Sequence, residues 1–287
     1  MTWFILSVVA AVSIAARDVS IKTYEDLQPM EIAVLELFWA IPALAVGCIV
    51  IETPPLDNTF WWAFILSIPI NFFAYILYLY AIKISPISLS VPFLSFTPAI
   101  MILTGYFILG ETINLWGGMG VGLIIMGGYV LHYRKAQSGF LAPFSAFAHE
   151  KGSWFMFIVA ILFAFAAVIG KKAIIHSSPL FFAFFFFLVF NATVLAGLLI
   201  SRKTNWQSIL KNSRKGMWLG FLLLVHISFH AQAIAISTAV YMVAIKRSSI
   251  LISVFLSWLI LKESDIHYRG IGTLLMFVGM LCITLLG

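Results

Sequence analysis

The chain has 287 residues, of which 62% are hydrophobic and 10% are charged, and its mean hydropathy is +1.07. Soluble domains carry about 25% charged residues, so this composition excludes a soluble globular protein and predicts an all-α integral membrane protein. The net charge of +6 does not indicate nucleic-acid binding. The basic residues gather at the ends of apolar segments, as membrane insertion requires.

Apolar segments of about 20 residues, each long enough to cross a hydrocarbon core ~30 Å thick as an α-helix, follow one another along the chain. The ten predicted transmembrane helices cover residues 2–22, 30–51, 59–82, 86–109, 114–133, 153–170, 179–201, 216–236, 239–261 and 267–286. The connections are short except 134–152 and 202–215, so any function is expected between the helices. The first segment lacks a basic region before it and a good cleavage site, so we expect it to be retained.

The chain contains an internal repeat. Residues 84–128 align with residues 236–280 without a gap, which places Ser85 on Ser237 and Glu111 on Glu263. We therefore predict two five-helix units, residues 1–135 and 153–287, joined by a connector at 136–152. Because five is odd, the units must have opposite orientations, and inverted repeats of this kind bind substrate at the midplane between them.

Residues shared by the two units favour packing or structural roles. Gly118 and Gly122 form a small-xxx-small pattern that predicts close approach of helices. Glu111 and Glu263 lie at equivalent helix ends, where a carboxylate can accept hydrogen bonds from the start of a helix. Cys48 and Cys282 lie in apolar segments and predict neither a disulfide nor a metal site.

The stretch "YLYAIKISPISLSVPFLSFTPAIMILTGYFILGE" at 78–111, the glycine-rich "GGMGVGLIIMGG" at 117–128 and the degenerate copy at 233–263 resemble the EamA family of the drug/metabolite transporter superfamily. The resemblance implies a ten-helix carrier with both termini in the cytoplasm. The charge distribution predicts the reverse, because twelve of the 17 Lys and Arg residues fall in loops on the side away from the termini and basic loops stay cytoplasmic.

Lys246 and Arg247 lie side by side inside the apolar segment 239–261. A charge at membrane depth costs ~2.5 to 3.5 kcal/mol on insertion scales and usually faces a partner or a cavity. The two side chains are about 100° apart on a helix, so they can converge on one cavity or point to different partners. Either they hold an anionic group of a substrate, or Glu36 neutralises one of them. The resemblance supports the first alternative, because phosphate translocators of the same superfamily hold the substrate phosphate with such a pair.

His226 and His230 lie one turn apart on a single helix face, with Gln232 nearby. They could bind a metal, but no third ligand is evident, so we predict that they line the substrate site and that no metal or cofactor is bound. Tyr78 aligns with His230 in the repeat. The full set of predicted substrate-binding residues is Glu36, Asn71, Tyr75, Tyr78, His226, His230, Gln232, Tyr241, Lys246 and Arg247.

Two further features are not predicted to bind the substrate. Arg17 and Asp18 near the end of the first segment are expected to pair with each other or to seal a gate. The connector residues 139–151 could lie along the membrane surface as an amphipathic helix, and a simple tether is the preferred interpretation.

The sequence thus predicts a secondary-active transporter that moves a small polar metabolite with an anionic group by alternating access. No phosphate-binding loop for ATP is present. The alternatives are an exporter of cationic or amphipathic drug-like compounds and a membrane-embedded enzyme, which would need more deep carboxylates than Glu36. We expect a multi-pass plasma-membrane protein that is a monomer or a homodimer and whose partners are a small-molecule substrate and the lipid bilayer.

Overall fold

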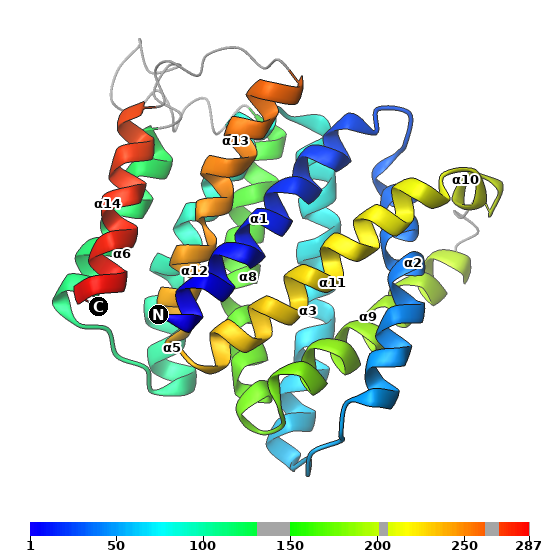
Figure 1. Cartoon of the computed structure of the whole chain (residues 1–287), viewed down its shortest axis with the longest axis horizontal. Helices are drawn as coiled ribbons and strands as arrows, with labels where there is room; N and C mark the ends of the chain where they lie inside the picture. The colour runs from blue at the N-terminus through cyan, green and yellow to red at the C-terminus, as the bar shows by residue number, and fades with distance from the viewer. Residues whose placement is uncertain (131–149, 201–205, 262–269, 287) are drawn as a thin grey trace.

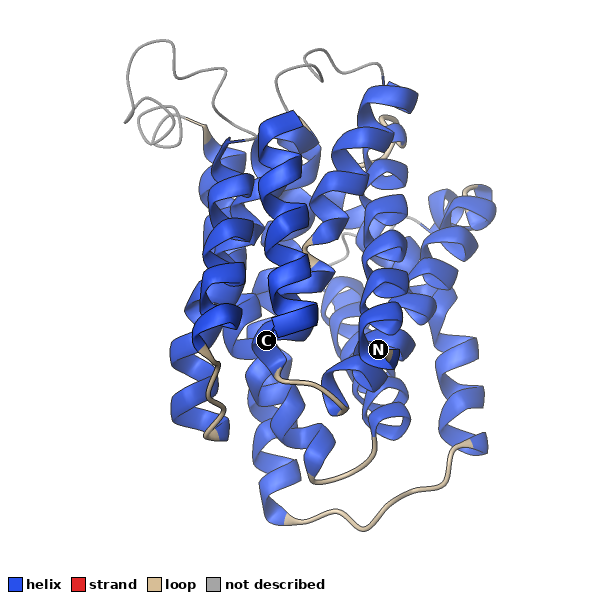
Figure 2. Ribbon diagram, turned by 60° about the vertical axis from the view of Figure 1, so that its left-hand side comes forward, coloured by secondary structure: helices blue, strands red, loops and turns tan. Residues whose placement is uncertain are grey.

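The computed structural model describes residues 1–130, 150–200, 206–261 and 270–286. Within these ranges the regular structure is entirely helical, with the helices standing side by side and joined by loops at two ends (Figures 1 and 2). The predictions for Glu263 and for most of the connector 136–152 lie outside the described residues.

The elements follow the predicted order of apolar segments. The first unit contains α1 (Thr2–Thr23), α2 (Pro29–Val50), α3 (Asn58–Ile84), α4 (Ile87–Ser90), the 3₁₀ helix η1 (Val91–Phe96), α5 (Thr97–Leu109) and α6 (Leu115–Val130). The second contains α8 (Lys151–Ile175), α9 (Pro179–Ile200), α10 (Trp206–Lys211), α11 (Ser213–Ala235), α12 (Ala239–Lys246), α13 (Ser248–Leu261) and α14 (Gly270–Leu286).

Seven helical segments among the described residues are long and apolar enough to cross a membrane, and the remaining apolar helices are shorter. The prediction of helix across 86–109 and 239–261 needs correction, because neither segment is one continuous α-helix. The first divides into α4, η1 and α5, and the second divides at Arg247, between α12 and α13. In the repeat alignment Arg247 falls on Ser95 of η1, so the two units are interrupted at equivalent positions. Pro92 and Pro98 favour the interruption in the first unit, since proline removes a helical hydrogen bond.

Helix boundaries carry the expected capping chemistry. The backbone N–H of Gln28 donates to Glu31 at 2.9 Å at the start of α2. Asp57 caps α3 by accepting from the backbone N–H of Phe60 at 2.8 Å, and its other oxygen lies 2.6 Å from Nδ1 of His176 in the second unit. The Phe60 hydrogen bond, together with His176, lowers the pKa of the Asp57 carboxyl.

Packing between the units follows the repeat. α1 packs on α11 and α3 packs on α8, so the first helix of each unit contacts the third helix of the other. α2 packs on α9, and α6 packs on α14, which pairs the equivalent second and fifth helices. This arrangement is consistent with two related units that face each other across a common interface.

Glycines bring the backbones of α6 and α14 close together. A Cβ on Gly120 would lie 2.7 Å from the carbonyl oxygen of Gly279, and a Cβ on Gly279 would lie 2.6 Å from that of Gly120. The prediction that Gly118 and Gly122 provide the close approach is wrong, because a Cβ on Gly122 meets no atom within 4 Å and one on Gly118 makes an ordinary contact. The pattern was recognised in the correct segment but on the wrong helix face.

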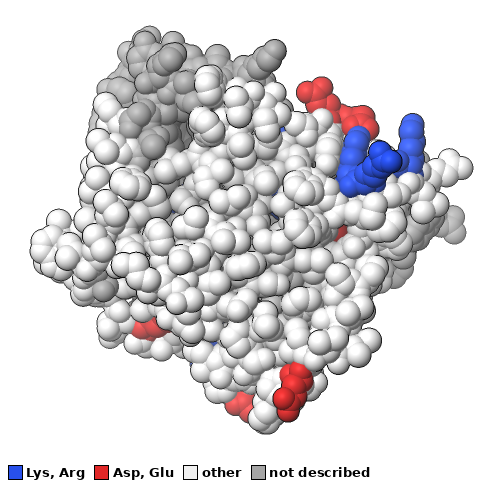
Figure 3. Space-filling view, in the orientation of Figure 1, with Lys and Arg blue, Asp and Glu red and all other residues white. Residues whose placement is uncertain are grey.

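Most of the surface in Figure 3 is uncharged, with basic side chains gathered at one end beside a few acidic ones, and further acidic side chains at the opposite end. At the basic end Lys215 contacts Asp26 at 2.8 Å and Lys83 donates to the backbone oxygen of Tyr24 at 2.7 Å. The broad uncharged belt fits a hydrocarbon environment.

Candidate functional site

A cavity of about 180 Å³ lies between the two units and is lined by residues from both. Most of the predicted substrate-binding residues line it, namely Asn71, Tyr75, Tyr78, His226, His230, Lys246 and Arg247. Much of its wall is formed by helices α1, α3, α8, α9 and α11. The two adjacent cations are Lys246, at the end of α12, and Arg247, which follows it.

Lys246 and Arg247 face this cavity together because the helix is interrupted at Arg247. The Lys246 ammonium lies 3.2 Å from Nδ1 of His230. Arg247 is 3% exposed, and its Nη2 donates to Oγ1 of Thr97 at 2.7 Å, while its Nε has no hydrogen-bond partner among the described residues. Within the described chain neither cation has a carboxylate within 4 Å.

Thr97 is the first residue of α5, so the Arg247 hydrogen bond joins the interrupted segment of one unit to that of the other. Ser95 and Ser248 flank these interruptions, and each has a buried hydroxyl without a partner among the described residues. Interrupted helices with free polar groups at the repeat interface are typical of transporter substrate sites.

Glu36 binds a different cation from the one predicted. Its two oxygens accept from Nε of Arg17 at 2.5 Å and from Nη2 of Arg17 at 2.7 Å, and the Tyr75 hydroxyl donates to it at 2.7 Å. Glu36 is fully buried behind the cavity wall. The alternative in which Glu36 neutralises Lys246 or Arg247 is therefore wrong, because the Glu36 carboxylate already forms a bidentate ion pair with the guanidinium of Arg17.

Asp18 does not pair with its neighbour Arg17, which corrects that prediction too. Adjacent residues on a helix point about 100° apart, so the two side chains reach different partners. Asp18 is fully buried; one of its oxygens accepts from the Tyr78 hydroxyl and the other from Oγ of Ser253 at 3.3 Å. Its hydrogen-bond donors within the described chain are thus neutral hydroxyls.

Besides Glu36, two predicted residues do not line the cavity. The Gln232 amide donates to the backbone oxygen of Ser228 on its own helix at 3.0 Å. The Tyr241 hydroxyl accepts from the backbone N–H of Asn114 at 3.2 Å and packs against Gly117. Tyr241 therefore joins α12 to the start of α6.

His226 and His230 lie side by side on α11, with ring centroids 5.5 Å apart, and both line the cavity. The Nδ1 atom of His226 is buried and has no hydrogen-bond partner among the described residues. No group of three metal-ligating side chains occurs in the described ranges. The pair is therefore positioned to hydrogen-bond a molecule in the cavity.

Lys171 is a cavity residue that sequence reasoning missed. It forms an ion pair with Glu111 and donates to the backbone oxygen of Ser237, while Glu111 also accepts from the backbone N–H of Ala239 at 2.9 Å. Glu111 thus ties α5, α8 and the start of α12 together, in line with a structural role. The apolar residues that continue past Lys172, to Ile175, were the available signal that this helix extends beyond residue 170.

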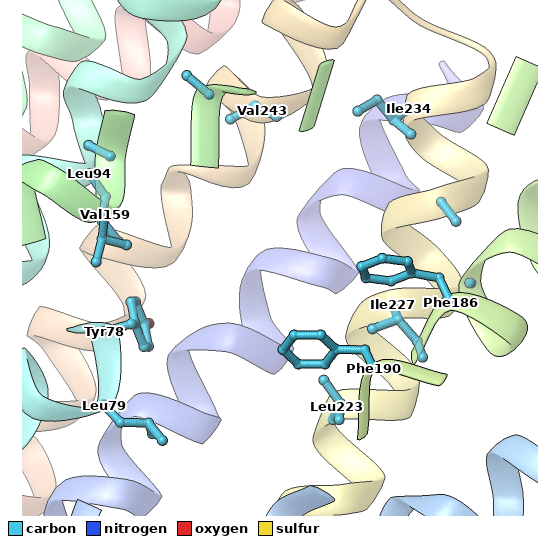
Figure 4. Packing of buried hydrophobic residues seen from close by; sticks show 14 of the residues in the cluster. Tyr78, Leu79, Leu94, Val159, Phe186, Phe190, Leu223, Ile227, Ile234 and Val243 are labelled. Atoms are coloured by element: carbon cyan, nitrogen blue, oxygen red, sulfur yellow. The ribbon is translucent and has the colours of Figure 1, made fainter. Parts of the chain in front are cut away.

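Phenylalanines form a large part of the remaining wall, a feature that the sequence reasoning also missed. Phe182, Phe186 and Phe190 of α9 stack in series, with centroid distances of 5.2 and 5.9 Å. Figure 4 shows the Phe186 and Phe190 rings projecting from α9 in the same direction, toward the side of the view on which Tyr78 lies. Phe163 of α8 and Phe187 also line the cavity. Their spacing of four residues in "PLFFAFFFFLVF" was the sequence signal.

The model of the EamA-like transporter family matches residues 1–133 and 150–285, which is nearly the whole chain and includes both units. The chain belongs to the EamA-like transporter family. This family is part of the drug/metabolite transporter superfamily, and membership identifies the chain as a multi-pass membrane protein of a transporter family.

Solved structures support the same fold for this EamA-like protein. One of them, titled only as the crystal structure of a protein, is 13% identical, with a TM-score of 0.66 over 99% of this chain and 96% of that one. No curated protein matches the chain. The substrate must therefore be inferred from the site itself.

Proposed function

We propose that this EamA-like protein is a secondary-active carrier that moves a small organic anion across the membrane by alternating access. Lys246 and Arg247 hold the anionic group, and the phenylalanines of α9 contact the apolar part of the substrate. The observation that carries the proposal is that both cations face one cavity between the units without a carboxylate within 4 Å in the described chain.

The charges around the cavity support an anionic substrate. Arg17 is neutralised by Glu36 and Lys171 by Glu111, which leaves Lys246 and Arg247 against Asp18. Two cations against one carboxylate leave an excess of one positive charge. An unpaired buried cation is costly, so an anion that enters the cavity gains a strong electrostatic interaction there.

The geometry suits an oxyanion attached to an apolar body. Arg247 retains an unpartnered Nε beside an Nη2 that is held by Thr97, and Lys246 adds a compact charge. Sites for small molecules are mostly apolar walls with a few converging polar groups. The Phe182, Phe186 and Phe190 series fits an aromatic or aliphatic group next to that anion.

The alternatives fit the cavity less well. Lys246 and Arg247 line it without a carboxylate within 4 Å in the described chain, and these two charges repel a cationic drug-like compound. For an enzyme, the deep carboxylates Asp18 and Glu36 would have to reach a substrate, but neither lines the cavity.

A thermal-stability screen of the purified protein in detergent tests the proposal. Benzoate, benzenesulfonate and phenyl phosphate should raise the Tm of the wild type by mass action, whereas benzyltrimethylammonium should not. Lys246→Gln and Arg247→Gln should each weaken anion binding by about 10- to 100-fold, since a hydrogen bond to a charged group contributes roughly 1.5 to 3 kcal/mol. Lys246→Arg should retain part of the affinity because the positive charge remains. It should lose the rest because a planar guanidinium differs from an ammonium in reach and geometry.

Lys215→Gln is the matched control, because Lys215 lies at the surface and contacts Asp26 at 2.8 Å, away from the cavity. It should respond to anions as the wild type does. Stabilisation by benzyltrimethylammonium together with failure of all three anions would contradict the proposed function.

A further inference from the structure

Asp18 is a buried carboxylate near the cavity that forms no ion pair within the described chain. It is fully buried in α1, and the hydroxyls of Tyr78 on α3 and Ser253 on α13 donate to its two oxygens. Ser253 belongs to the second unit, so Asp18 lies where the two units meet. Glu36 and Glu111, by contrast, are each held by a cation within 4 Å.

While the cavity is empty, an ionised Asp18 offsets one of the two positive charges of Lys246 and Arg247. Tyr78 both donates to Asp18 and lines the cavity, so Asp18 is one side chain away from the proposed anion site. An anion that binds Lys246 and Arg247 adds a second negative charge near Asp18. Two negative charges then share a poorly solvated region, which favours protonation of one of them.

We propose that Asp18 takes up a proton when the anion binds, so that substrate and proton cross the membrane together. The proposal rests on the proposed anion site. The proton comes from water on the side where the anion enters, binds one Asp18 oxygen, and leaves to water when the anion is released on the other side. Coupling is reciprocal, so protonation of Asp18 must strengthen anion binding by the same factor.

Tyr78 gives this coupling a structural route. While Asp18 is ionised, the Tyr78 hydroxyl donates to it. A protonated Asp18 no longer requires that hydrogen bond, so the hydroxyl can turn to donate to an anion in the cavity that Tyr78 lines. Tyr75 is the natural comparison, because its hydroxyl donates at 2.7 Å to Glu36, whose charge Arg17 fixes.

Other ionisable groups near Asp18 must be distinguished from it. α4 and the described residues of α13 contribute none. The groups on α1, on α2 and on the elements packed against α1 that line the cavity or pair with a lining residue are Arg17, Glu36, Tyr75, Tyr78, His226, His230, Lys246 and Arg247. Lys22, one turn after Asp18 on α1, donates to the backbone oxygens of Ile82, Lys83 and Ser85. The other acidic, basic and tyrosine side chains on these elements are Glu31, Tyr80, Lys83, Arg214, Lys215 and Tyr241, and none of them lines the cavity. Among all these groups the two histidines are the competing proton sites at neutral pH.

The test is calorimetric titration of the full-length protein in detergent with benzenesulfonate, which stays ionised throughout and therefore cannot carry the proton itself. Titrations at pH 7 in buffers with different ionisation enthalpies give the number of protons taken up. We expect about one proton per bound anion in the wild type, and an affinity that rises about tenfold per unit fall in pH while Asp18 is ionised in the free protein. This measurement needs no variant.

Asp18→Asn mimics the protonated carboxyl. It should bind benzenesulfonate without proton uptake, with an affinity that no longer depends on pH and that matches the wild type at low pH. Tyr78→Phe should weaken the pH dependence, and Tyr75→Phe should preserve it. His226→Gln and His230→Gln should retain proton uptake.

The outcomes separate the two proposals. If benzenesulfonate binds the wild type with no proton uptake, or if uptake persists in Asp18→Asn and disappears in a histidine variant, the Asp18 proposal is wrong and the anion site stands. If benzenesulfonate neither binds nor stabilises the wild type, the anion site itself is contradicted.

Discussion

At the scale of single residues, the buried charges fall into two groups that differ in their partners. Arg17 and Lys171 each hold a carboxylate and contribute to the folded structure, whereas Lys246 contacts His230 and Arg247 contacts Thr97. Charges of the first kind are expected to affect stability when changed. Charges of the second kind are expected to affect binding.

The Arg17–Glu36 pair provides a stability prediction. Arg17→Gln or Glu36→Gln alone leaves one buried charge without its partner and should destabilise the protein by about 3 to 5 kcal/mol. The double variant should recover much of that loss, because no charge is then left unpaired. The effect is measured as the change in the midpoint of thermal unfolding in detergent, with the folded protein quantified by size-exclusion chromatography after heating. Additive losses in the double variant would show that the two side chains do not act as a pair.

At the scale of elements, the interrupted segments and the α6–α14 contact have different physical causes. The interruptions place Lys246, Arg247 and Thr97 at one cavity, so they serve the site. The α6–α14 contact is a packing feature in which backbone atoms of Gly120 and Gly279 approach each other. Lipid provides no hydrophobic drive for helix association, so such close packing supplies much of the attraction.

The two glycines of α6 allow a matched comparison. Gly120→Ala places a methyl group 2.7 Å from the Gly279 carbonyl oxygen and must push the helices apart, with an expected loss of about 1 to 3 kcal/mol. Gly122→Ala meets no atom within 4 Å and should be neutral or stabilising by up to about 1 kcal/mol, since alanine favours helix. Detergent melting curves compare the two. Equal losses would show that helix packing at Gly120 is not the cause.

At the scale of the whole molecule, charge is distributed unequally between the two ends. Contacts of Lys83 with Tyr24 and of Lys215 with Asp26 gather basic residues at one end, while Asp57 and His176 meet at the loops that follow α2 and α8. The positive-inside rule predicts that the basic end faces the cytoplasm. The family resemblance implied the reverse.

Orientation can be measured by labelling with a membrane-impermeant thiol reagent. In a background without Cys48 and Cys282, a cysteine at Glu52 should react from outside intact cells and one at Lys211 should not, and tags at both termini should be accessible from outside. The reason is the electrostatic cost of moving the basic loops across the membrane. Reaction at Lys211 with protection at Glu52 would instead favour cytoplasmic termini.

Much of the candidate site was accessible from the sequence because a deep charge in an apolar segment is costly wherever it points. That cost marked Lys246 and Arg247, and the spacing of His226 and His230 on one helix face marked a third and fourth lining residue. Asp18 was misjudged for the opposite reason: it lies near the end of its segment, where a charge can reach water, and its burial depends on α3 and α13 covering it.

The sequence by itself determined the membrane class, the two related units and the family, because these depend on composition and on patterns that repeat along the chain. The tertiary structure alone decided which carboxylate meets which cation, where the two helices are interrupted, and which glycine face packs. Those features depend on contacts between segments far apart in the chain, such as Arg17 with Glu36, Arg247 with Thr97 and Gly120 with Gly279. The apolar composition of a segment does not by itself specify which of its faces contacts which neighbouring helix.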